Sequence, residues 1–305
     1  MNSNDSSERY IDPSTHLKKK LVSSALKYHN GMPIFSLIEF NIYGNCNRSC
    51  SFCPVSMPEI YTRKMEGIDV SLFEKAMNDL REIDYQGTIL FSAFSEPTLH
   101  KELPGIIRLA KRIVPQARVE MVSNGDTIRK NKQKLMGYYE AGIDRINFSL
   151  YDGPKQMEEF LNIRKELGLN EDQMNLRRRY FEDGNFGMTI SNRAGLINSN
   201  EYRDEKEEEI VELPLKASCY YPSYMLLVDY SGEVILCPHD WEKKFTAGNI
   251  KDKTIWDIWA GDRFKLARKL LAEKNRKFAP CNKCDVKGDV MGKESFEAWN
   301  ECYKS

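Results

Sequence analysis

Apolar runs and helical repeats alternate along the middle of this chain. Short runs rich in β-branched and aromatic residues predict strands at 34–42, 88–94, 118–122, 145–150 and 186–190. Between them, apolar residues at helical spacing predict helices at 71–80, 103–114, 132–141 and 156–167. Ser71 and Glu74 form a capping box at the start of the first of these helices. Strands that alternate with helices predict a parallel α/β sheet with ligands at the carboxyl ends of its strands.

The pattern changes on both sides of this alternation. A leading helix is predicted at 14–28, and the strongly charged segment 198–211 indicates a solvated connector or a helix. After it, the turn Ser231-Gly232 separates two short apolar runs and predicts a hairpin. Two helices follow, the first beginning near Thr254 with Asp257 in its capping box. We therefore expect three units, an N-terminal helical extension, a core domain and a smaller C-terminal module, at 1–33, 34–211 and 212–305.

Composition and charge argue against several classes of function. The 305 residues include 45 basic and 45 acidic side chains, so net charge gives no case for binding nucleic acid or a membrane surface. No apolar run approaches the roughly twenty residues of a membrane span, and the polar N-terminus lacks the apolar core of a signal peptide. The eight cysteines fall in metal-like spacings, which favours a reducing compartment over a disulfide framework. We therefore expect a cytoplasmic protein.

Three cysteines form the array C-x3-C-x2-C directly after the first predicted strand. Cys46, Cys50 and Cys53, here called the cysteine triad, are close enough in sequence to hold three irons of a [4Fe–4S] cube. Such clusters are usually held by four cysteines, so a triad leaves one iron open to a substrate or cofactor. The alternatives are three unrelated core thiols or a zinc site, although zinc motifs usually contain two C-x2-C pairs.

The residues around the triad resemble the cluster loop of the radical S-adenosylmethionine (SAM) enzymes. In that family an aromatic residue commonly precedes the third cysteine and packs by the adenine, and Phe52 stands at this position. The resemblance implies a partial (β/α) TIM-like barrel whose open iron chelates the amino and carboxylate groups of SAM. Reductive cleavage of SAM then gives methionine and a 5′-deoxyadenosyl radical, which takes a hydrogen atom from an unactivated C–H bond.

A second motif follows the second predicted strand. Radical SAM enzymes usually have a Gly-Gly-Glu-Pro stretch here that holds the methionyl ammonium of SAM, and this chain has Phe94-Ser95-Glu96-Pro97. Glu96 and Pro97 are kept, while Phe94 and Ser95 replace the two glycines. A carboxylate and backbone carbonyls suit an ammonium group, so the resemblance implies that Ser95 and Glu96 contact SAM. The alternative is a surface glutamate beside a loop proline.

Weaker matches lie at the ends of the later strands. Ser123 and Asn124 end the third strand and Ser149 ends the fourth, at positions that resemble family sites for the SAM ribose or carboxylate. Ser-Asn-Gly is also an ordinary turn sequence. Arg193 follows the last predicted strand and could bind the SAM carboxylate or a substrate oxyanion in a bidentate manner. A structural ion pair with a nearby carboxylate is the alternative for Arg193.

A second set of cysteines lies in the C-terminal module. Cys219, Cys237, Cys281 and Cys284, here called the cysteine quartet, resemble the auxiliary-cluster domain called SPASM, in its shorter twitch form. The resemblance implies one auxiliary [4Fe–4S] cluster with four protein ligands, and the alternative is a four-cysteine zinc ribbon. His239 and Asp240 follow a quartet ligand and either face the substrate or have a capping or core role. Cys302, which we place in a polar tail, is the leftover thiol and a candidate hydrogen-atom donor.

The auxiliary cluster would decide the outcome of the reaction. If it accepts an electron from the substrate radical, the reaction is a dehydrogenation, as in twitch relatives that act on cyclitols and protein side chains. If a cysteine returns a hydrogen atom to the other face, the reaction is an epimerisation. Few residues precede the first strand, too few for a small peptide-recognition domain. We therefore expect a radical SAM oxidoreductase that dehydrogenates a carbohydrate or aminocyclitol-like small molecule.

Three rival functions stay open at this stage. They are a sugar epimerase, a ribosomal-peptide maturase and, outside enzymes, an iron–sulfur electron carrier or a zinc-binding interaction protein. A carrier would need neither the open iron nor Glu96. The expected partners are a carbohydrate-like substrate, which we favour over a peptide, and a flavodoxin- or ferredoxin-type reductant.

Overall fold

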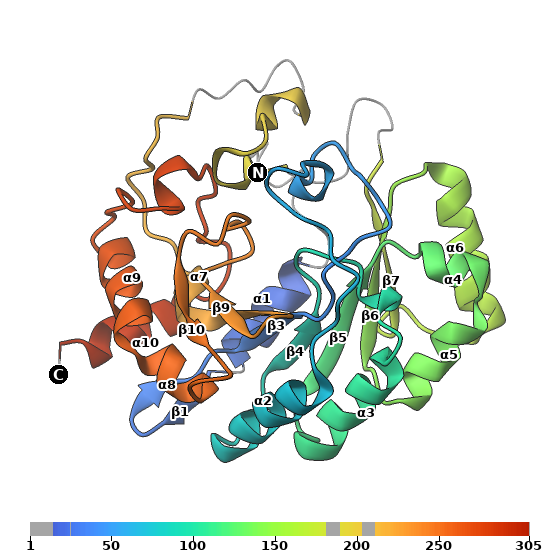
Figure 1. Ribbon diagram of the computed structural model, residues 1–305, viewed down its shortest axis with the longest axis horizontal. Helices are drawn as coiled ribbons and strands as arrows, with labels where there is room; N and C mark the ends of the chain where they lie inside the picture. Colours follow the sequence, from blue (N-terminus) through green and yellow to red (C-terminus); the bar gives the residue numbers. More distant parts are fainter. Residues whose placement is uncertain (1–14, 25, 181–189, 203–210, 305) are drawn as a thin grey trace, which may run out of the picture.

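A single eight-stranded sheet forms the centre of the computed structural model, which describes residues 15–24, 26–180, 190–202 and 211–304 (Figure 1). The strand order is β10-β9-β8-β3-β4-β5-β6-β7. The six strands β8, β3, β4, β5, β6 and β7 are parallel to one another. At the other edge of the sheet, β9 pairs antiparallel with both β8 and β10. The strands are β3 (Leu37–Asn41), β4 (Thr88–Phe91), β5 (Arg118–Ser123), β6 (Arg145–Leu150), β7 (Met174–Arg178), β8 (Met225–Asp229), β9 (Glu233–Ile235) and β10 (Thr246–Asn249).

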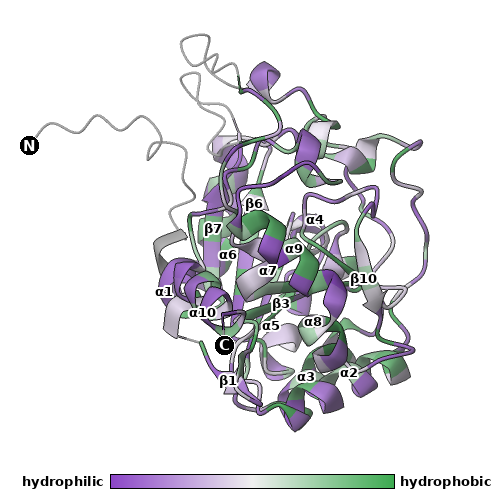
Figure 2. Cartoon of the chain, turned by 90° about the vertical axis from the view of Figure 1, so that its left-hand side faces the viewer, coloured by the Kyte–Doolittle hydropathy of each residue, from purple (hydrophilic) through white to green (hydrophobic). Residues whose placement is uncertain are grey.

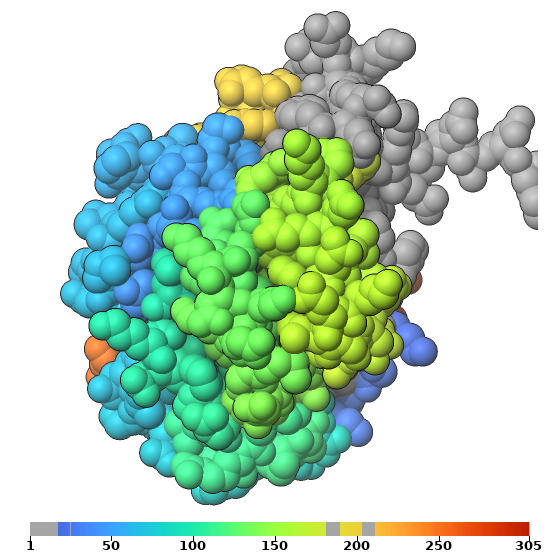
Figure 3. All heavy atoms as spheres, turned by 90° about the vertical axis from the view of Figure 1, so that its right-hand side faces the viewer, coloured from blue at the N-terminus to red at the C-terminus, as the bar shows by residue number. Residues whose placement is uncertain are grey.

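Crossover helices cover the outer face of the parallel strands. They are α2 (Val70–Glu82), α3 (Leu103–Ile113), α4 (Asp126–Lys130), α5 (Gln133–Glu140) and α6 (Pro154–Glu166). Hydrophilic and hydrophobic residues alternate along α2 and α3, as expected of half-buried helices (Figure 2). In the space-filling view these helices form a continuous surface that runs from cyan to yellow-green, with the blue segment that follows β3 at its upper left (Figure 3).

The inner face of the sheet is more polar than its outer face. Ile38 and Phe40 of β3 are fully buried in the main apolar core. Because alternate residues of a strand point to opposite faces, Glu39 and Asn41 face inward. Other polar residues with the same alternation include Asn147, Ser149 and Asp229. The parallel strands therefore surround a polar interior beneath the loops at their carboxyl ends.

The C-terminal residues join the same sheet. β8 pairs with β3 along its whole length, so main-chain hydrogen bonds connect the segment after residue 212 to the core. The helices α7 (Tyr221–Tyr224), α8 (Ile255–Ala260), α9 (Asp262–Ala272) and α10 (Lys293–Cys302) lie beside this end of the sheet (Figure 1). The leading helix α1 (Thr15–Ser24) and the short hairpin of β1 (Tyr28–His29) and β2 (Met32–Pro33) precede β3. The expected boundary at 212 stays a prediction.

The parallel α/β core predicted from the sequence is confirmed, with three differences in detail. β7 was not predicted, and the strand expected at 186–190 falls almost entirely outside the described residues. The predicted capping box at α2 is wrong, because Asp69 caps this helix by accepting hydrogen bonds from Ser71 N and Leu72 N. The capping box at Thr254 is confirmed, since Thr254 Oγ1 accepts from Asp257 N at 3.0 Å.

Candidate active site

The cysteine triad lies on the loop that leaves the carboxyl end of β3. All three thiols are free and half-buried. Cys53 N donates to Cys50 O at 3.0 Å, and a short 3-10 turn at Pro54–Ser56 follows. Burial raises the pKa of Cys46 to about 12 and that of Cys50 to about 11, and the negative charge of neighbouring thiols adds to both rises. The three thiols therefore lie within electrostatic reach of one another, and a cluster bound by them would displace their protons.

Two arginines fix the triad loop to the rest of the core. Arg48, between the first and second cysteines, forms ion pairs with Asp126 at 2.5 Å and Asp152 at 2.7 Å. These carboxylates follow β5 and β6, so Arg48 ties the loop to the ends of two other strands. Arg63 donates from its guanidinium to Cys46 O at 2.9 Å and to Arg48 O at 3.0 Å. Sequence reasoning missed both roles, although the position of Arg48 within the triad was a signal for the first.

Glu96 is buried and hydrogen-bonded by the protein itself. Its Oε1 accepts from Thr98 N, Thr98 Oγ1 and Ser123 Oγ at 3.1, 2.6 and 2.8 Å, and its Oε2 accepts from Asn124 N at 2.8 Å. Burial raises the pKa of Glu96, and these hydrogen bonds oppose the rise. The carboxylate therefore joins the ends of β4 and β5. This geometry holds the Glu96 carboxylate in place between the loops, and its direct contact with the SAM ammonium, which the sequence motif implied, stays a prediction.

The two residues that replace the family's glycines have partners of their own. The Phe94 ring lies 4.5 Å from the Trp241 ring, and Ser95 Oγ donates to Asn41 Oδ1 at 2.6 Å. Asn41 in turn donates to the buried Asp229 at 2.5 Å, which connects β3 with β8. Phe94 therefore contacts the loop after Cys237, and the departure from glycine has a packing reason.

Asn124 reaches back toward the triad. Its Nδ2 donates to Asn47 Oδ1 at 2.8 Å and lies 3.9 Å from Cys46 Sγ. Ser123 Oγ accepts from Gly125 N at 3.0 Å, besides its bond to Glu96. The sequence prediction that Ser123 and Asn124 lie beside the triad agrees with this geometry, and direct contact with SAM stays a prediction.

Phe52 and Ser149 lie at the inner side of the triad loop. The Phe52 ring is 5.8 Å from that of Tyr151 and 6.1 Å from that of Tyr202, so three aromatic rings gather next to the cysteines. Ser149 Oγ accepts from Arg177 Nη2 at 2.8 Å. The structure thus places Phe52 against Cys50 and Cys53, while contact of Ser149 with SAM stays a prediction.

Arg193 lies between the two cysteine sets. It sits on a short 3-10 turn with a φ of 49°, and its buried Nε has no hydrogen-bond partner among the described residues. Its charge acts on the Cys53 thiol on one side and on His239 on the other. Burial lowers the pKa of His239 to about 3, and Arg193 adds to this effect. A half-buried cation whose Nε has no partner among the described residues could bind an anionic or hydroxyl group of a ligand at this place.

The residues after Cys237 connect the quartet to the triad. Trp241 packs against Phe94 and also lies 5.6 Å from Tyr61, while its buried Nε1 has no partner among the described residues. Val55, Cys46 and Cys53 belong to the same apolar cluster as Trp241. Asp240 is buried and accepts from Lys244 N and Phe245 N, both at 2.8 Å, so it stabilises the turn that leads into β10.

The cysteine quartet forms a second group of free, mostly buried thiols. Burial raises the pKa of all four, and Cys237 is also influenced by the other three members. Gly288 has a φ of +75°, and a Cβ there would lie 2.3 Å from Cys219 Sγ, so glycine keeps space open beside this thiol. Four converging thiols with space beside them fit an iron–sulfur cluster with four protein ligands.

No site for a single metal ion is evident in the described part of the chain, where no three His, Cys, Asp or Glu side chains group closely enough to hold one. A [4Fe–4S] cube differs from a single ion because each cysteine binds a different iron. The donor sets of triad and quartet consist of soft thiolates, which suit iron–sulfur clusters.

Cys302 lies away from both cysteine sets. It ends α10, and its Sγ is 3.3 Å from Gly31 O. Gly31 precedes β2 and therefore lies at the amino end of β3, opposite the triad loop. The sequence-based placement of Cys302 in a polar tail is wrong, since it belongs to a helix packed on the core. The structure does not bring it to the candidate site.

Glu39 is an inward-facing residue that sequence reasoning missed, and it gives a pH-dependent prediction. Burial raises its pKa from 4.5 to about 7, against the opposing effects of Ser92, Lys18 and Ala93. Between these two pH values the Glu39 carboxyl is protonated in the folded state and ionised in the unfolded state. The free energy of unfolding therefore falls as pH rises. We expect Glu39→Gln to remove this fall, worth about 3 kcal/mol between pH 5 and pH 8.

Urea unfolding of wild type and Glu39→Gln at both pH values measures the effect. Glu120→Gln is the matched control. Glu120 lies on β5, is as buried as Glu39 and forms an ion pair with Arg118 at 2.5 Å. Parallel pH dependences of wild type and Glu39→Gln would contradict the prediction.

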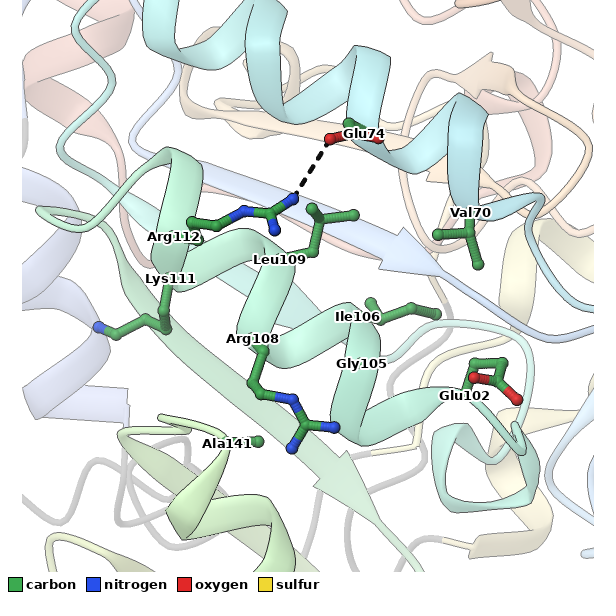
Figure 4. Close-up of a pocket in the computed structure, with 10 residues that line it drawn as sticks. All are labelled: Val70, Glu74, Glu102, Gly105, Ile106, Arg108, Leu109, Lys111, Arg112 and Ala141. Atoms are coloured by element: carbon green, nitrogen blue, oxygen red, sulfur yellow. Dashed lines mark hydrogen bonds and ion pairs between the residues drawn. The ribbon is translucent and has the colours of Figure 1, made fainter.

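The hollows detected on the surface lie on the outer helices. One of about 670 Å³ lies between α2 and α3, where an ion pair of 3.3 Å joins Arg112 to Glu74 (Figure 4). It shares no residue with the cysteine sets and contains no cysteine or histidine. We therefore assign the chemistry to the loops at the carboxyl ends of the strands.

Two family models match the chain. The Radical SAM superfamily model matches residues 40–184, which contain the triad, and the SPASM iron-sulfur cluster-binding domain model matches residues 219–285, which contain the quartet. In the described part of the chain, no helix is long and apolar enough to pass through a membrane.

Known proteins resemble the chain over most of its length. The S-adenosyl-L-methionine-dependent 2-deoxy-scyllo-inosamine dehydrogenase of Niallia circulans is 29% identical over 255 residues, covering 83% of this chain and 93% of that protein. A tungsten-containing aldehyde ferredoxin oxidoreductase cofactor-modifying protein of Pyrococcus furiosus is 19% identical over 85% of this chain and 90% of that protein.

A solved structure gives the same result at the level of the fold. The crystal structure of BtrN in complex with AdoMet and 2-DOIA is 26% identical to this chain, with a TM-score of 0.67, and covers 84% of this chain and 94% of its own. The AdoMet-bound anSMEcpe, at 14% identity and a TM-score of 0.53, shares the fold. The chain contains a radical SAM domain and a C-terminal SPASM-type domain, and it is an oxidoreductase that uses SAM and [4Fe–4S] clusters.

Proposed function

We propose that this enzyme oxidises a secondary alcohol of a carbohydrate or aminocyclitol-like small molecule to a ketone. The observation that carries the proposal is the position of Trp241, in the loop after Cys237, which shares an apolar cluster with Cys46 and Cys53 of the triad and lies 4.5 Å from Phe94. A substrate that has lost one hydrogen atom must still lose one electron and one proton to become a ketone. A cluster at the quartet, with four protein ligands, would stand next to the site and could take that electron.

The substrate class is supported by the relatives. The Niallia circulans protein is named as a dehydrogenase of 2-deoxy-scyllo-inosamine, and this chain spans 93% of it. The solved structure of BtrN contains AdoMet together with 2-DOIA. Buried polar side chains at the inner face, such as Asn147 and Ser149, suit a ligand with several hydroxyl groups.

Each cofactor has candidate residues in the chain. The triad would hold the cluster that binds SAM, and the quartet would hold the auxiliary cluster. When bound, SAM at the reduced first cluster supplies the 5′-deoxyadenosyl radical that removes a hydrogen atom from the substrate. A flavodoxin- or ferredoxin-type reductant would supply the electron for the first cluster.

The residues around the triad bind and shield the ligands. Phe52, with Tyr151 and Tyr202 beside it, would pack by the adenine and exclude water. Asn124 and Ser149 would bind the ribose or carboxylate of SAM by amide and hydroxyl groups, together with Ser95 and Ser123. Arg193 would donate its free Nε to the SAM carboxylate or to a substrate oxygen. Glu96 would hold the loops in place by its bonds to Ser123 and Asn124.

Mass spectrometry of the product in ordinary and heavy water tests the proposal. With an aminocyclitol such as 2-deoxy-scyllo-inosamine, we expect a product lighter by two hydrogen atoms and one 5′-deoxyadenosine for each product molecule. No deuterium should be bound to carbon after turnover in heavy water. A product with the mass of the substrate and one carbon-bound deuterium would show an epimerase instead, because a thiol hydrogen exchanges with solvent before transfer.

A further inference from the structure

We infer that Arg276 is a built-in counter-cation of the auxiliary cluster, which raises the reduction potential of that cluster and so makes it a better electron acceptor. The inference rests on the proposed function, in which the auxiliary cluster accepts the substrate's electron. Arg276 follows α9, and its side chain is only 2% exposed. It is one of the largest buried side chains of the described residues.

The hydrogen bonds of Arg276 surround the quartet. Its Nε donates to Ala217 O and its Nη2 to Ser218 O, both at 2.8 Å, and these carbonyls directly precede Cys219. Its Nη1 donates to Val286 O at 2.6 Å and its Nη2 to Lys287 O at 2.5 Å, directly after Cys284 and Asp285. One guanidinium therefore joins the chain segment before the first quartet ligand to the segment after the last.

The charge of Arg276 is not paired with a carboxylate in the part of the chain that the structure describes. Among the described residues, no Asp or Glu forms an ion pair with it, and all its hydrogen bonds go to neutral backbone carbonyls. A buried cation without a counter-ion costs several kcal/mol. Two other arginines are compensated differently. The half-buried Arg48 pairs with carboxylates, and the buried Arg268 lies over the Trp259 and Trp299 rings at 4.1 and 3.7 Å.

The quartet supplies the missing negative charge once it holds a cluster. The hydrogen bonds of Arg276 to Ser218 O and Val286 O place its charge beside the chain segments that carry Cys219 and Cys284. Four thiolates on a [4Fe–4S] cube leave a net anion, and reduction adds another negative charge. A nearby buried cation stabilises the reduced form more than the oxidised form, which raises the potential.

The test measures the potential of the auxiliary cluster alone. The full chain with Cys46, Cys50 and Cys53 changed to Ala is reconstituted anaerobically and titrated with reductant, followed by electron paramagnetic resonance without substrate. Adding Arg276→Gln should lower the midpoint potential by at least about 59 mV, a tenfold change for a one-electron couple. Arg276→Lys, which keeps the charge, should stay close to the parent, and Lys277→Gln, at the exposed neighbouring cation, should leave the potential unchanged.

Iron content decides the remaining cases. An iron-replete Arg276→Gln variant with an unchanged potential would overturn the inference. If Arg276→Gln does not retain iron, Arg276→Lys should retain it, because charge is the proposed requirement. Loss of iron in both variants would show that the bonds to the carbonyls matter and the charge does not, which also overturns the inference. Failure to find an oxidised product would refute the proposed dehydrogenation without changing these potentials, so the two proposals fail separately.

Discussion

Changing Cys46, Cys50 and Cys53 together to Ala is expected to abolish formation of 5′-deoxyadenosine while leaving about four irons per chain. The triad is the only cysteine set in the sequence that leaves an iron open, so SAM has no other iron to bind. The quartet belongs to a separate loop system around Cys219, Gly288 and Arg276 and should keep its cluster. Iron and sulfide analysis, together with quantification of 5′-deoxyadenosine under dithionite, measures both effects.

The matched control changes the other cysteine at the surface of the core. Cys302→Ala removes one thiol at Gly31 O, at the opposite end of β3, and should keep about eight irons and full SAM cleavage. Residual 5′-deoxyadenosine from the triple variant would show that SAM is cleaved elsewhere, and loss of all iron would show that the two cluster sites do not assemble independently.

The second large effect concerns the quartet. Cys281→Ser with Cys284→Ser should stop formation of the oxidised product while SAM cleavage continues, because the substrate would no longer have an electron acceptor. The expected iron content is about four per chain, held by the triad. Product and 5′-deoxyadenosine are measured in the same sample, so the ratio of the two is the readout. A fall of both in parallel would point to loss of the fold or of substrate binding.

Cys302→Ser separates this prediction from the epimerase alternative. In a dehydrogenase the thiol of Cys302 is not needed, and the structure places it against Gly31. We expect the variant to form the oxidised product at the wild-type ratio to 5′-deoxyadenosine. If it cleaved SAM without forming product, Cys302 would be the hydrogen-atom donor of an epimerase, and the placement of α10 would need another explanation.

The sequence predicted the outer half of the fold well, because the strands that contact the crossover helices carry regular apolar residues. β7 was missed for a physical reason. Its Met174 is buried in the main core and Leu176 packs against it, but Asn175 and Arg177 face the polar interior, so the strand does not read as an apolar run. Parallel strands usually carry apolar residues on both faces, and a search for such strands misses those that line a polar barrel interior.

The candidate site was predictable where short spacing carries the information. Both cysteine sets were found from spacing and flanking residues, whereas the roles of Arg48, Arg63 and Arg276 depend on contacts between distant segments. Glu96 shows the same limit. Its motif marked the right loop, but only the structure shows that Ser123 and Asn124 already donate to its carboxylate. A motif identifies a group, and the fold decides which atoms that group can still bind.

The pairing of β3 with β8 has a consequence for electron transfer. β3 leads into the triad loop, and β9, separated from β3 only by β8, leads to Cys237, so both cysteine sets are connected to one hydrogen-bonded sheet. The distance that an electron must cross between the quartet site and the triad site is therefore set by the register of these strands. The loops at the ends of the strands can change to suit a new substrate while the distance between electron donor and electron acceptor is preserved. Electron transfer between the two sites and the substrate specificity of the enzyme can thus change separately.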